Sequence, residues 1–227
     1  MPHCQSIAVS ARFLTSGLTA LILCLALAWE SVSAVTFDPD RLAAYARRHY
    51  GGRAGRAVAS WQALLVRAAR LSEQEKLRMV NGFWNRALVG GEDISIRGRP
   101  DYWATPLQSL AKGAGDCEDY VIGKYFSLLY LGVSPEKLRF IYVRARIGGQ
   151  SIAHMILGYY PQPQATPLVL GSLVDRVQSA RDRPDLTPVF SFNAQGVYVP
   201  GGKRSPVEGI GRWRDLSSRM RTEGFQP

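Results

Sequence analysis

One short segment, GAGDCEDYVIGKY (113–125), contains the most reactive side chain that this sequence offers. Its cysteine, Cys117, lies between Asp116 and Glu118, and Asp119 follows directly. A thiol attacks as a thiolate, and neighbouring negative charges oppose the loss of its proton. Cys117 is therefore either an inert buried residue or a working nucleophile whose surroundings offset this charge.

His154 is the candidate partner of such a thiol. It lies in the alternating segment IAHMI (152–156), so that it faces away from Ala153 and Met155 if the segment is a strand. A histidine in a strand is more often a structural residue than a catalytic one. Cysteine attack on a carbonyl needs a base that later protonates the leaving amine, and an imidazole near the thiol would also lower the thiol pKa.

The first residues have the pattern of an export signal. Arg12 precedes the apolar run Phe13–Trp29, and the small residues of Ser31–Ala34 follow it. This order predicts a signal peptide at 1–34, cleaved after Ala34. An uncleaved membrane anchor is the alternative, for which the run is slightly short. We expect an exported protein.

Export changes what the cysteines can do. Cleavage would remove Cys4 and Cys24, so Cys117 would be the only cysteine in a compartment that oxidises thiols. It could then form no intramolecular disulfide. The remaining residues, 35–227, are enough for a single domain with a substantial core.

The formal charge is +10, and much of the excess is arginine near the start of the predicted mature chain. Solvated helix faces explain such a run in most proteins. A docking surface for an anionic lipid headgroup or an acidic protein is the sharper interpretation. Nucleic acid is not an expected partner outside the cytoplasm. The arginines before Ser72 are Arg41, Arg47, Arg48, Arg53, Arg56, Arg67 and Arg70.

Hydrophobic periodicity places helices in the first half of the chain and at the cysteine. A capping box formed by Ser72 and Glu75 begins the third helix, and Gly132 ends the helix that Cys117 opens. The segment Val89–Pro100 is rich in glycine and charge and is predicted to be a loop. The other predicted helices are Asp40–Tyr50, Ala57–Leu71 and Cys117–Leu131.

Alternation with a period of two follows, together with β-branched and aromatic residues. The glycine pair Gly148-Gly149 indicates a hairpin between the first two strands. Helices followed by an antiparallel sheet predict an α+β fold. The strand candidates are Leu138–Arg146, Ser151–Tyr160, Leu168–Val174, Val189–Phe192 and Val197–Val199.

Several segments, in this order, resemble the bacterial transglutaminase-like cysteine proteinases. The resemblance covers about Leu71 to Val199, most of the predicted mature chain. It implies a papain-like, transglutaminase-like fold in which N-terminal helices and a catalytic helix pack on an antiparallel sheet. The matching motifs are YWATP (102–106), GDCEDY (115–120), LGV (131–133), AHM (153–155) and RPDLxPVxSFN (183–193).

The resemblance also implies a function. It implies a periplasmic, calcium-dependent endopeptidase with Cys117 as nucleophile and His154 as base. Members of the family cut the N-terminal region of a large surface adhesin, which releases the adhesin and controls biofilm formation. A LapD-like inner-membrane cyclic-di-GMP receptor acts as their inhibitor. These are the substrate and partner that we expect for this chain.

Calcium would resolve the conflict around the thiol. The resemblance implies that Asp116 and Glu118 bind the ion, and a hard dication prefers such carboxylate oxygens. Bound there, it would cancel the charge that keeps the thiol protonated. From the residues alone, the simpler interpretation is that Asp116 caps the helix while Glu118 and Asp119 favour its dipole. The two interpretations are compatible.

One departure from the family pattern concerns the histidine. The family has an aspartate, which orients the imidazole, where this chain has Gly171 in the segment LVLGSL (168–173). Ser172 should point to the other face of the strand, and Asp175 lies farther along it. A water above Gly171 is a weak substitute. Loss of the orienting acid is costly in a triad.

We therefore expect a cysteine endopeptidase whose activity is lowered by Gly171. A catalytically weak or dead homologue that binds an adhesin or the receptor is the alternative. Transfer of the acyl group to an amine instead of water would use the same residues.

Overall fold

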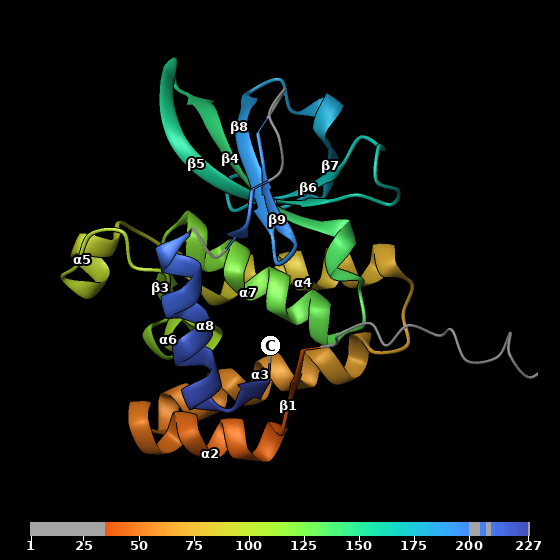
Figure 1. Ribbon diagram of the computed structural model, residues 1–227. Coiled ribbons are helices and arrows are strands. Elements are labelled where there is room, and N and C mark those ends of the chain that lie inside the picture. Colours follow the sequence, from red (N-terminus) through yellow and green to blue (C-terminus); the bar gives the residue numbers. More distant parts are fainter. Residues whose placement is uncertain (1–34, 200–204, 208–209, 227) are drawn as a thin grey trace, which may run out of the picture. The chain divides into compact units, whose positions relative to one another are not determined.

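Seven helices and a six-stranded antiparallel sheet form the part of the chain that the computed structural model describes, residues 35–199, 205–207 and 210–226 (Figure 1). The chain from Ser33 on forms one unit by its internal contacts. The predicted export signal lies outside the described residues. The arrangement of helices against one antiparallel sheet confirms the predicted α+β class. Among the described residues, no helix has the length and apolarity needed to cross a bilayer.

The helices begin where their caps predict. Asp38 accepts hydrogen bonds from the first turn of α2, and the predicted capping box of Ser72 and Glu75 starts α4. Thr105 and Gln108 form a second capping box, before α6. The helices are α2 (Pro39–Tyr50), α3 (Gly52–Ala68), α4 (Glu73–Ala87), α5 (Asp93–Arg97), α6 (Pro106–Lys112), α7 (Cys117–Tyr130) and α8 (Gly211–Glu223).

The main sheet has the strand order β7-β6-β5-β4-β8-β9, with each neighbouring pair antiparallel. The predicted hairpin joins its two longest strands, in which Val143 lies opposite His154. The strands of this sheet are β4 (Leu138–Ile147), β5 (Gln150–Tyr159), β6 (Leu168–Leu170), β7 (Gln178–Ser179), β8 (Leu186–Asn193) and β9 (Gly196–Tyr198).

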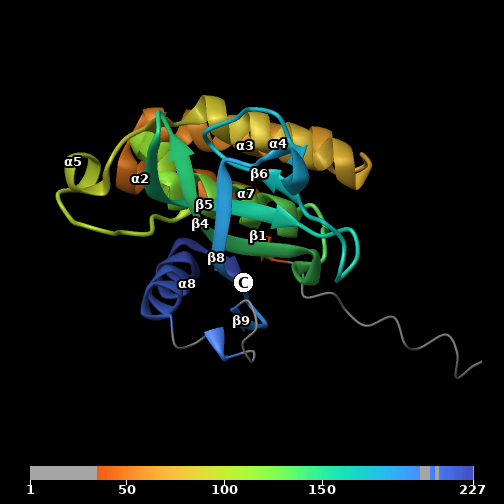
Figure 2. The same ribbon diagram turned by 90° about the horizontal axis from the view of Figure 1, so that it is seen from above.

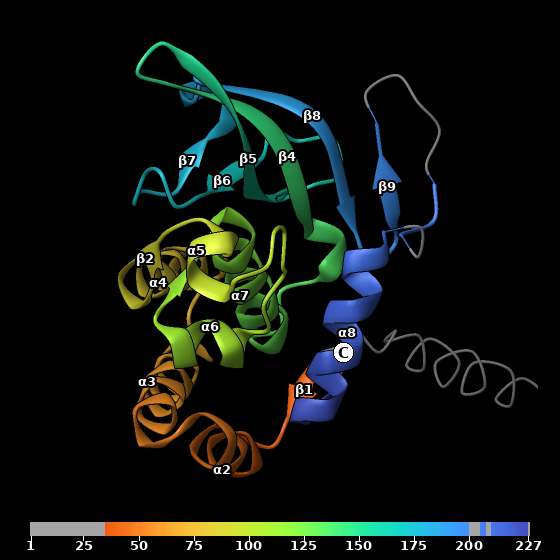
Figure 3. The ribbon, with the colours of Figure 1, turned by 90° about the vertical axis from the view of Figure 1, so that its left-hand side faces the viewer.

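Two short strand pairs lie outside the main sheet. The pair of β1 (Thr36–Phe37) and β10 (Phe225–Gln226) is antiparallel, and the pair of β2 (Val89–Gly90) and β3 (Ala114–Gly115) is parallel. The sheet covers α7 and α4, while α3 and then α2 lie farther from it (Figures 1 and 3). Figure 2 shows α8 beside the sheet, next to β9.

The structure corrects several sequence predictions. Helix α3 begins five residues earlier than the predicted Ala57, because Gly51 alone, with φ +88°, separates it from α2. The predicted loop Val89–Pro100 contains β2 and α5, which tertiary contacts stabilise. The third strand ends at Leu170 instead of Val174. Helices α6 and α8 were not predicted, and α8 returns the chain to the helical layer after the sheet.

A buried hydroxyl joins three helices at the centre of the core. Ser127 Oγ on α7 accepts hydrogen bonds from Trp61 Nε1 on α3 (2.8 Å) and Trp84 Nε1 on α4 (2.9 Å), and it donates to the Gly123 carbonyl (2.6 Å). A Cβ on Gly123 would lie 2.5 Å from the Trp84 ring, so only glycine lets α4 approach α7 this closely. The position of α7, and with it that of Cys117, depends on this junction.

We predict that Ser127→Ala lowers the free energy of unfolding by about 2–4 kcal/mol, because two buried indole N–H groups lose their acceptor. Urea denaturation measures the change. Ser60→Ala is the matched control, since Ser60 Oγ also donates to the carbonyl four residues before it, that of Arg56, but is exposed. Its effect should stay within about 0.5 kcal/mol. Equal losses for the two variants would contradict the assigned role of the junction.

Candidate active site

Cys117 is the first residue of α7, as the sequence predicts. The Asp116 side chain caps the helix by accepting from the backbone N–H groups of Glu118 (3.1 Å) and Asp119 (3.3 Å). Strand β3 leads into this turn, and a Cβ on Gly115 would lie 2.6 Å from the Asp119 Cβ. Because Gly115 has no side chain, its backbone can lie against the first turn of α7. This close contact fixes the position of Cys117 at the start of the helix.

Cys117 and His154 line one cleft of about 730 Å³. Its walls come from the segment around β2 and α5, from the start of α7, and from β4 and β5. The backbone of Met155, on β5, lies close enough to the thiol to lower its pKa. The structure thus brings the two predicted residues to the same cleft, although they are distant in the sequence.

The surroundings of the thiol are strongly acidic. Cys117 Sγ donates a hydrogen bond to Glu118 Oε2 at 2.8 Å. Burial and the charge of Glu118 raise the pKa of the Cys117 thiol far above its ordinary value. Burial and the charges of Glu118 and Asp119 also raise the pKa of Asp116, to about 9. These carboxylates hold the thiol protonated, as the sequence suggested.

Three carboxylates lie together beside the thiol, and they form what we call the acidic cluster. Asp93, Asp116 and Asp119 each place an oxygen within 4.8 Å of the others. Arg97 offsets part of this charge, with Nη2 at 2.6 Å from Asp119 Oδ2. Burial nevertheless raises the pKa of Asp119 to about 6. Clustered, crowded carboxylate oxygens suit a hard dication such as calcium.

The acidic cluster only partly matches the predicted calcium ligands. Asp116 belongs to it, but Asp93 and Asp119 take the other places, while the Glu118 carboxylate faces the thiol. The role of Glu118 as a ligand stays a prediction. Asp93 gave no signal in the sequence, because its segment was assigned to a loop. Asp119 was recognised only as a residue that favours the helix dipole.

His154 is buried, with 6% of its surface exposed, and its Nε2 has no hydrogen-bond partner among the described residues. Burial and the charges of Arg183 and Lys124 lower the pKa of His154 to about 4. The imidazole is therefore neutral at neutral pH and able to accept a proton. Among the described residues, no group binds Nε2 to orient the ring.

Gly171 follows β6, the neighbour of the His154 strand. Leu157 pairs with Leu170, so alternation places Gly171 on the same face as Ile156 and His154. A Cβ on Gly171 would meet Ile156 Cγ2 at 3.3 Å, with no other close neighbour among the described residues. The neighbouring strands that the sequence predicted are confirmed, and a side chain at position 171 requires Ile156 to shift by a few tenths of an ångström.

Two polar side chains from the helices donate hydrogen bonds to the Gly171 carbonyl. It accepts hydrogen bonds from Lys124 Nζ (3.0 Å) on α7 and from Asn85 Nδ2 (3.1 Å) on α4. Asn85 also binds Lys124 Nζ through Oδ1 (2.7 Å) and the Asp175 carboxylate through Nδ2 (2.9 Å). Asp175 therefore serves this network, which leaves the position beside His154 without its carboxylate.

Lys124 was not among the predicted site residues, although a lysine inside the apolar run YVIGKYFSLLY (120–130) is a signal that could have drawn attention to it. Its side chain is fully buried, and burial lowers the pKa of Lys124 to about 7. It connects the helix that bears Cys117 to the strand next to His154. We infer that Lys124 helps to fix the position of α7, which bears Cys117, relative to the strands near His154.

Comparisons with known proteins agree with this geometry. The sequence profile of the bacterial transglutaminase-like cysteine proteinases (BTLCP) matches residues 56–178. EGTA-treated Legionella pneumophila LapG is 32% identical, covers 82% of this chain and 100% of its own, and has a TM-score of 0.73. Calcium-bound Legionella pneumophila LapG is 34% identical over 81% of this chain and 99% of its own, with a TM-score of 0.70. A search of curated proteins found no match.

The buried lysine leads to a prediction on pH and stability. In the unfolded chain a lysine keeps its proton to about pH 10, whereas Lys124 in the folded protein loses it near pH 7. Between these values Lys124 is protonated in the unfolded state but not in the folded state, so this group adds up to about 1.4 kcal/mol per pH unit to the slope of the unfolding free energy against pH. Asp116, whose pKa in the folded protein is raised to about 9, contributes to this slope with the opposite sign. Lys124→Met should therefore make the slope less positive than that of the wild type.

Urea denaturation at about pH 7, 8 and 9 measures the slope of the unfolding free energy against pH. The variant also loses stability because the Gly171 carbonyl loses a donor, but that loss is the same at each pH and does not change the slope. Lys112→Met, at an exposed lysine of α6, is the control and should keep the wild-type slope. If Lys124→Met keeps that slope as well, the amine of Lys124 does not lose its proton in this range.

Proposed function

Because this chain belongs to the bacterial transglutaminase-like cysteine proteinase family, we propose that it is a LapG-like, calcium-dependent cysteine endopeptidase with Cys117 as nucleophile and His154 as base. The observation that carries the proposal is a free thiol at a helix start, the one cysteine among the described residues, in the cleft that a buried neutral imidazole also lines. The fold and the family agree with LapG, while the roles of the two residues are the proposal.

The proposed reaction is acyl transfer to water. His154 takes the thiol proton, and the thiolate of Cys117 attacks the scissile carbonyl. The proton passes to the leaving amine, and water then hydrolyses the thioester. The Asp116 cap uses the N–H groups of Glu118 and Asp119 but not that of Cys117, which is thus free to stabilise the oxyanion.

Calcium has a clear place in this proposal. The acidic cluster supplies oxygen ligands from Asp93, Asp116 and Asp119, and Glu118 lies at its border beside the thiol. When bound, the ion would neutralise charge that now opposes thiolate formation. The solved relatives described as EGTA-treated and calcium-bound support a role for calcium in LapG itself.

The biological setting completes the proposal. The predicted export signal at 1–34 places the protein in the periplasm. The substrate is then the N-terminal region of a large surface adhesin, whose release controls biofilm formation, and the partner is a LapD-like inner-membrane cyclic-di-GMP receptor that acts as inhibitor. Family membership is the support for both, together with the signal-like order of the first residues.

A binding function without cleavage is the alternative. It is favoured by one specific observation, the His154 Nε2 that has no partner among the described residues, beside a glycine in place of a carboxylate. In that case the cleft would still recognise the adhesin or the receptor.

The first test measures the thiol directly. Iodoacetamide should alkylate Cys117 slowly in EGTA at neutral pH and faster in calcium, by about tenfold for each unit by which the ion lowers the thiol pKa. Asp116→Asn together with Glu118→Gln keeps a helix cap but removes the two carboxyl groups expected to bind calcium. This variant should react at a rate that calcium does not change. Equal wild-type rates in calcium and EGTA would remove calcium from the proposal.

The second test restores the missing carboxylate. Gly171→Asp should raise cleavage of an adhesin N-terminal fragment in calcium by about tenfold or more, because an acid beside His154 orients the ring and stabilises its charged form. Gly171→Leu adds an apolar side chain of similar size and should give no gain. Cys117→Ala should abolish cleavage.

A gel-based cleavage assay compares the four proteins, and a pull-down measures whether each binds the fragment. A wild-type rate equal to that of Gly171→Asp would mean that another group already orients His154. Binding without cleavage by both would favour the binding function.

A further inference from the structure

The helices farthest from the sheet carry arginines that the cleft chemistry does not use. On α2, Arg41 and Arg48 lie about two turns apart and are exposed, on the side away from the buried Leu42 and Ala46. On α3, Arg56 and Arg67 lie about three turns apart and are also exposed. We call this exposed side of the two helices the basic face; it comprises Arg41, Arg47, Arg48, Arg53, Arg56 and Arg67.

These arginines are not neutralised by neighbours. Among the described residues, none of them belongs to an ion pair. The only acids between Thr36 and Leu71 are Asp38 and Asp40, both at the start of α2. The Asp38 carboxylate is already used as the cap of that helix. The basic face therefore presents uncompensated positive charge.

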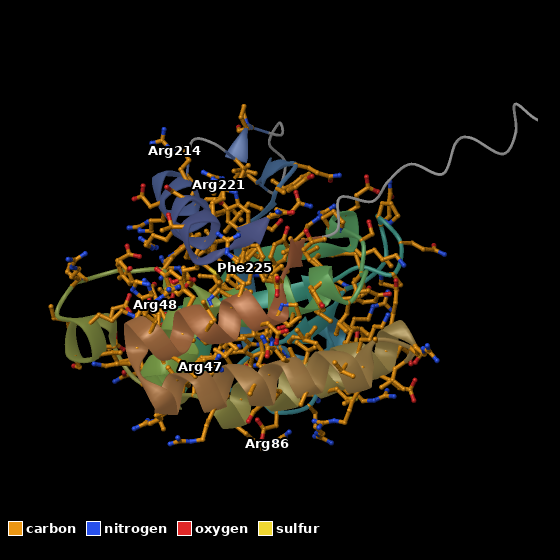
Figure 4. The ribbon with its side chains drawn as sticks, turned by 90° about the horizontal axis from the view of Figure 1, so that it is seen from below. Arg47, Arg48, Arg86, Arg214, Arg221 and Phe225 are labelled. Carbon is orange, nitrogen blue, oxygen red and sulfur yellow. The ribbon has the colours of Figure 1, made fainter. Side chains whose placement is uncertain are left out.

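The basic face extends toward α8. Tyr50 at the end of α2 donates a hydrogen bond to Glu223 at the end of α8 (3.2 Å). Figure 4 looks onto this end of the molecule and shows Arg47 and Arg48 on α2 together with Arg214 and Arg221 on α8. None of the residues that line the active-site cleft comes from α2 or α3. A partner on the basic face would leave the cleft open.

We propose that the basic face docks the protein onto a phospholipid bilayer whose surface is anionic. The residues between the arginines are small, such as Ala44, Ala59 and Ala63. On α3 the one large apolar side chain that is strongly exposed is Val66, at 78%. Protein interfaces depend on aromatic and apolar anchors seated in pockets, and the surface around the basic face offers few. Tyr50, at the end of α2, is 38% exposed, but its hydroxyl is bound to Glu223. A layer of anionic headgroups needs no pocket and attracts each nearby arginine separately.

Vesicle binding tests the proposal on the chain that begins at Val35. This part contains the hydrophobic core and forms one compact unit by its internal contacts. The chain should co-sediment with phosphatidylcholine vesicles that contain phosphatidylglycerol, but not with pure phosphatidylcholine vesicles. Added salt should release it, because exposed charges are screened.

Two variants with equal net charge distinguish a docking face from a general charge effect. Arg48→Gln, Arg56→Gln and Arg67→Gln together should raise the lipid concentration for half-maximal binding by about 100-fold, or about fivefold for each arginine. Arg144→Gln, Arg176→Gln and Arg181→Gln change exposed arginines on the sheet side and should shift it by less than about threefold. Because all six residues are exposed, thermal unfolding should be unchanged.

Three results would overturn the proposal. The first is equal loss of vesicle binding in both variants, and the second is binding that does not depend on phosphatidylglycerol. The third is binding to a soluble acidic polypeptide, such as polyglutamate, that depends on the same three arginines while vesicles are not bound. That result would assign the basic face to an acidic protein.

Discussion

Negative charge crowded at the start of α7 is the constraint on which the rest of the site depends. One carboxylate, that of Asp116, caps the helix, borders the thiol and belongs to the acidic cluster. Because the region is buried, each added carboxylate makes the others harder to ionise and the Cys117 thiol harder to deprotonate. Arg97 offsets part of the charge through its ion pairs with Asp119 and Asp93. A dication bound among these carboxylates would offset this charge.

Two buried polar residues of α7, the helix that carries the thiol, bind neighbouring elements. Ser127 joins it to α3 and α4, and Lys124 joins it to the strand after which Gly171 stands. Buried polar groups of this kind are costly unless every partner is in place, so they specify one arrangement of helix and sheet. The position of Cys117 relative to His154 follows from that arrangement, whereas His154 Nε2 has no hydrogen-bond partner in the described part of the chain.

Positive and negative charges gather in different parts of the molecule. The formal charge of +10 comes from exposed arginines, many of them on α2 and α3, while the active-site cleft is lined by carboxylates. A net charge therefore says little about the site, where the local field has the opposite sign. Burial keeps the cleft charges unscreened, while solvent and salt weaken those of the exposed arginines.

Local structure could be predicted from the sequence because neighbouring residues encode it. The caps at Asp116 and Ser72, the apolar stripe of α7 and the hairpin between β4 and β5 each depend on residues a few positions apart. The cysteine at a helix start, the histidine in a strand and the absence of an acid at Gly171 were all visible in the same way.

Only the tertiary structure decided which distant residues meet. Asp93 joins Asp116 and Asp119, and Lys124 reaches the Gly171 carbonyl, through contacts that no local pattern contains. The return of α8 and the pairing of β10 with β1 likewise depend on packing between the two ends of the described chain. Propensity and periodicity act over one helix or one strand, whereas burial of charge and the partners that satisfy it are set by the whole fold.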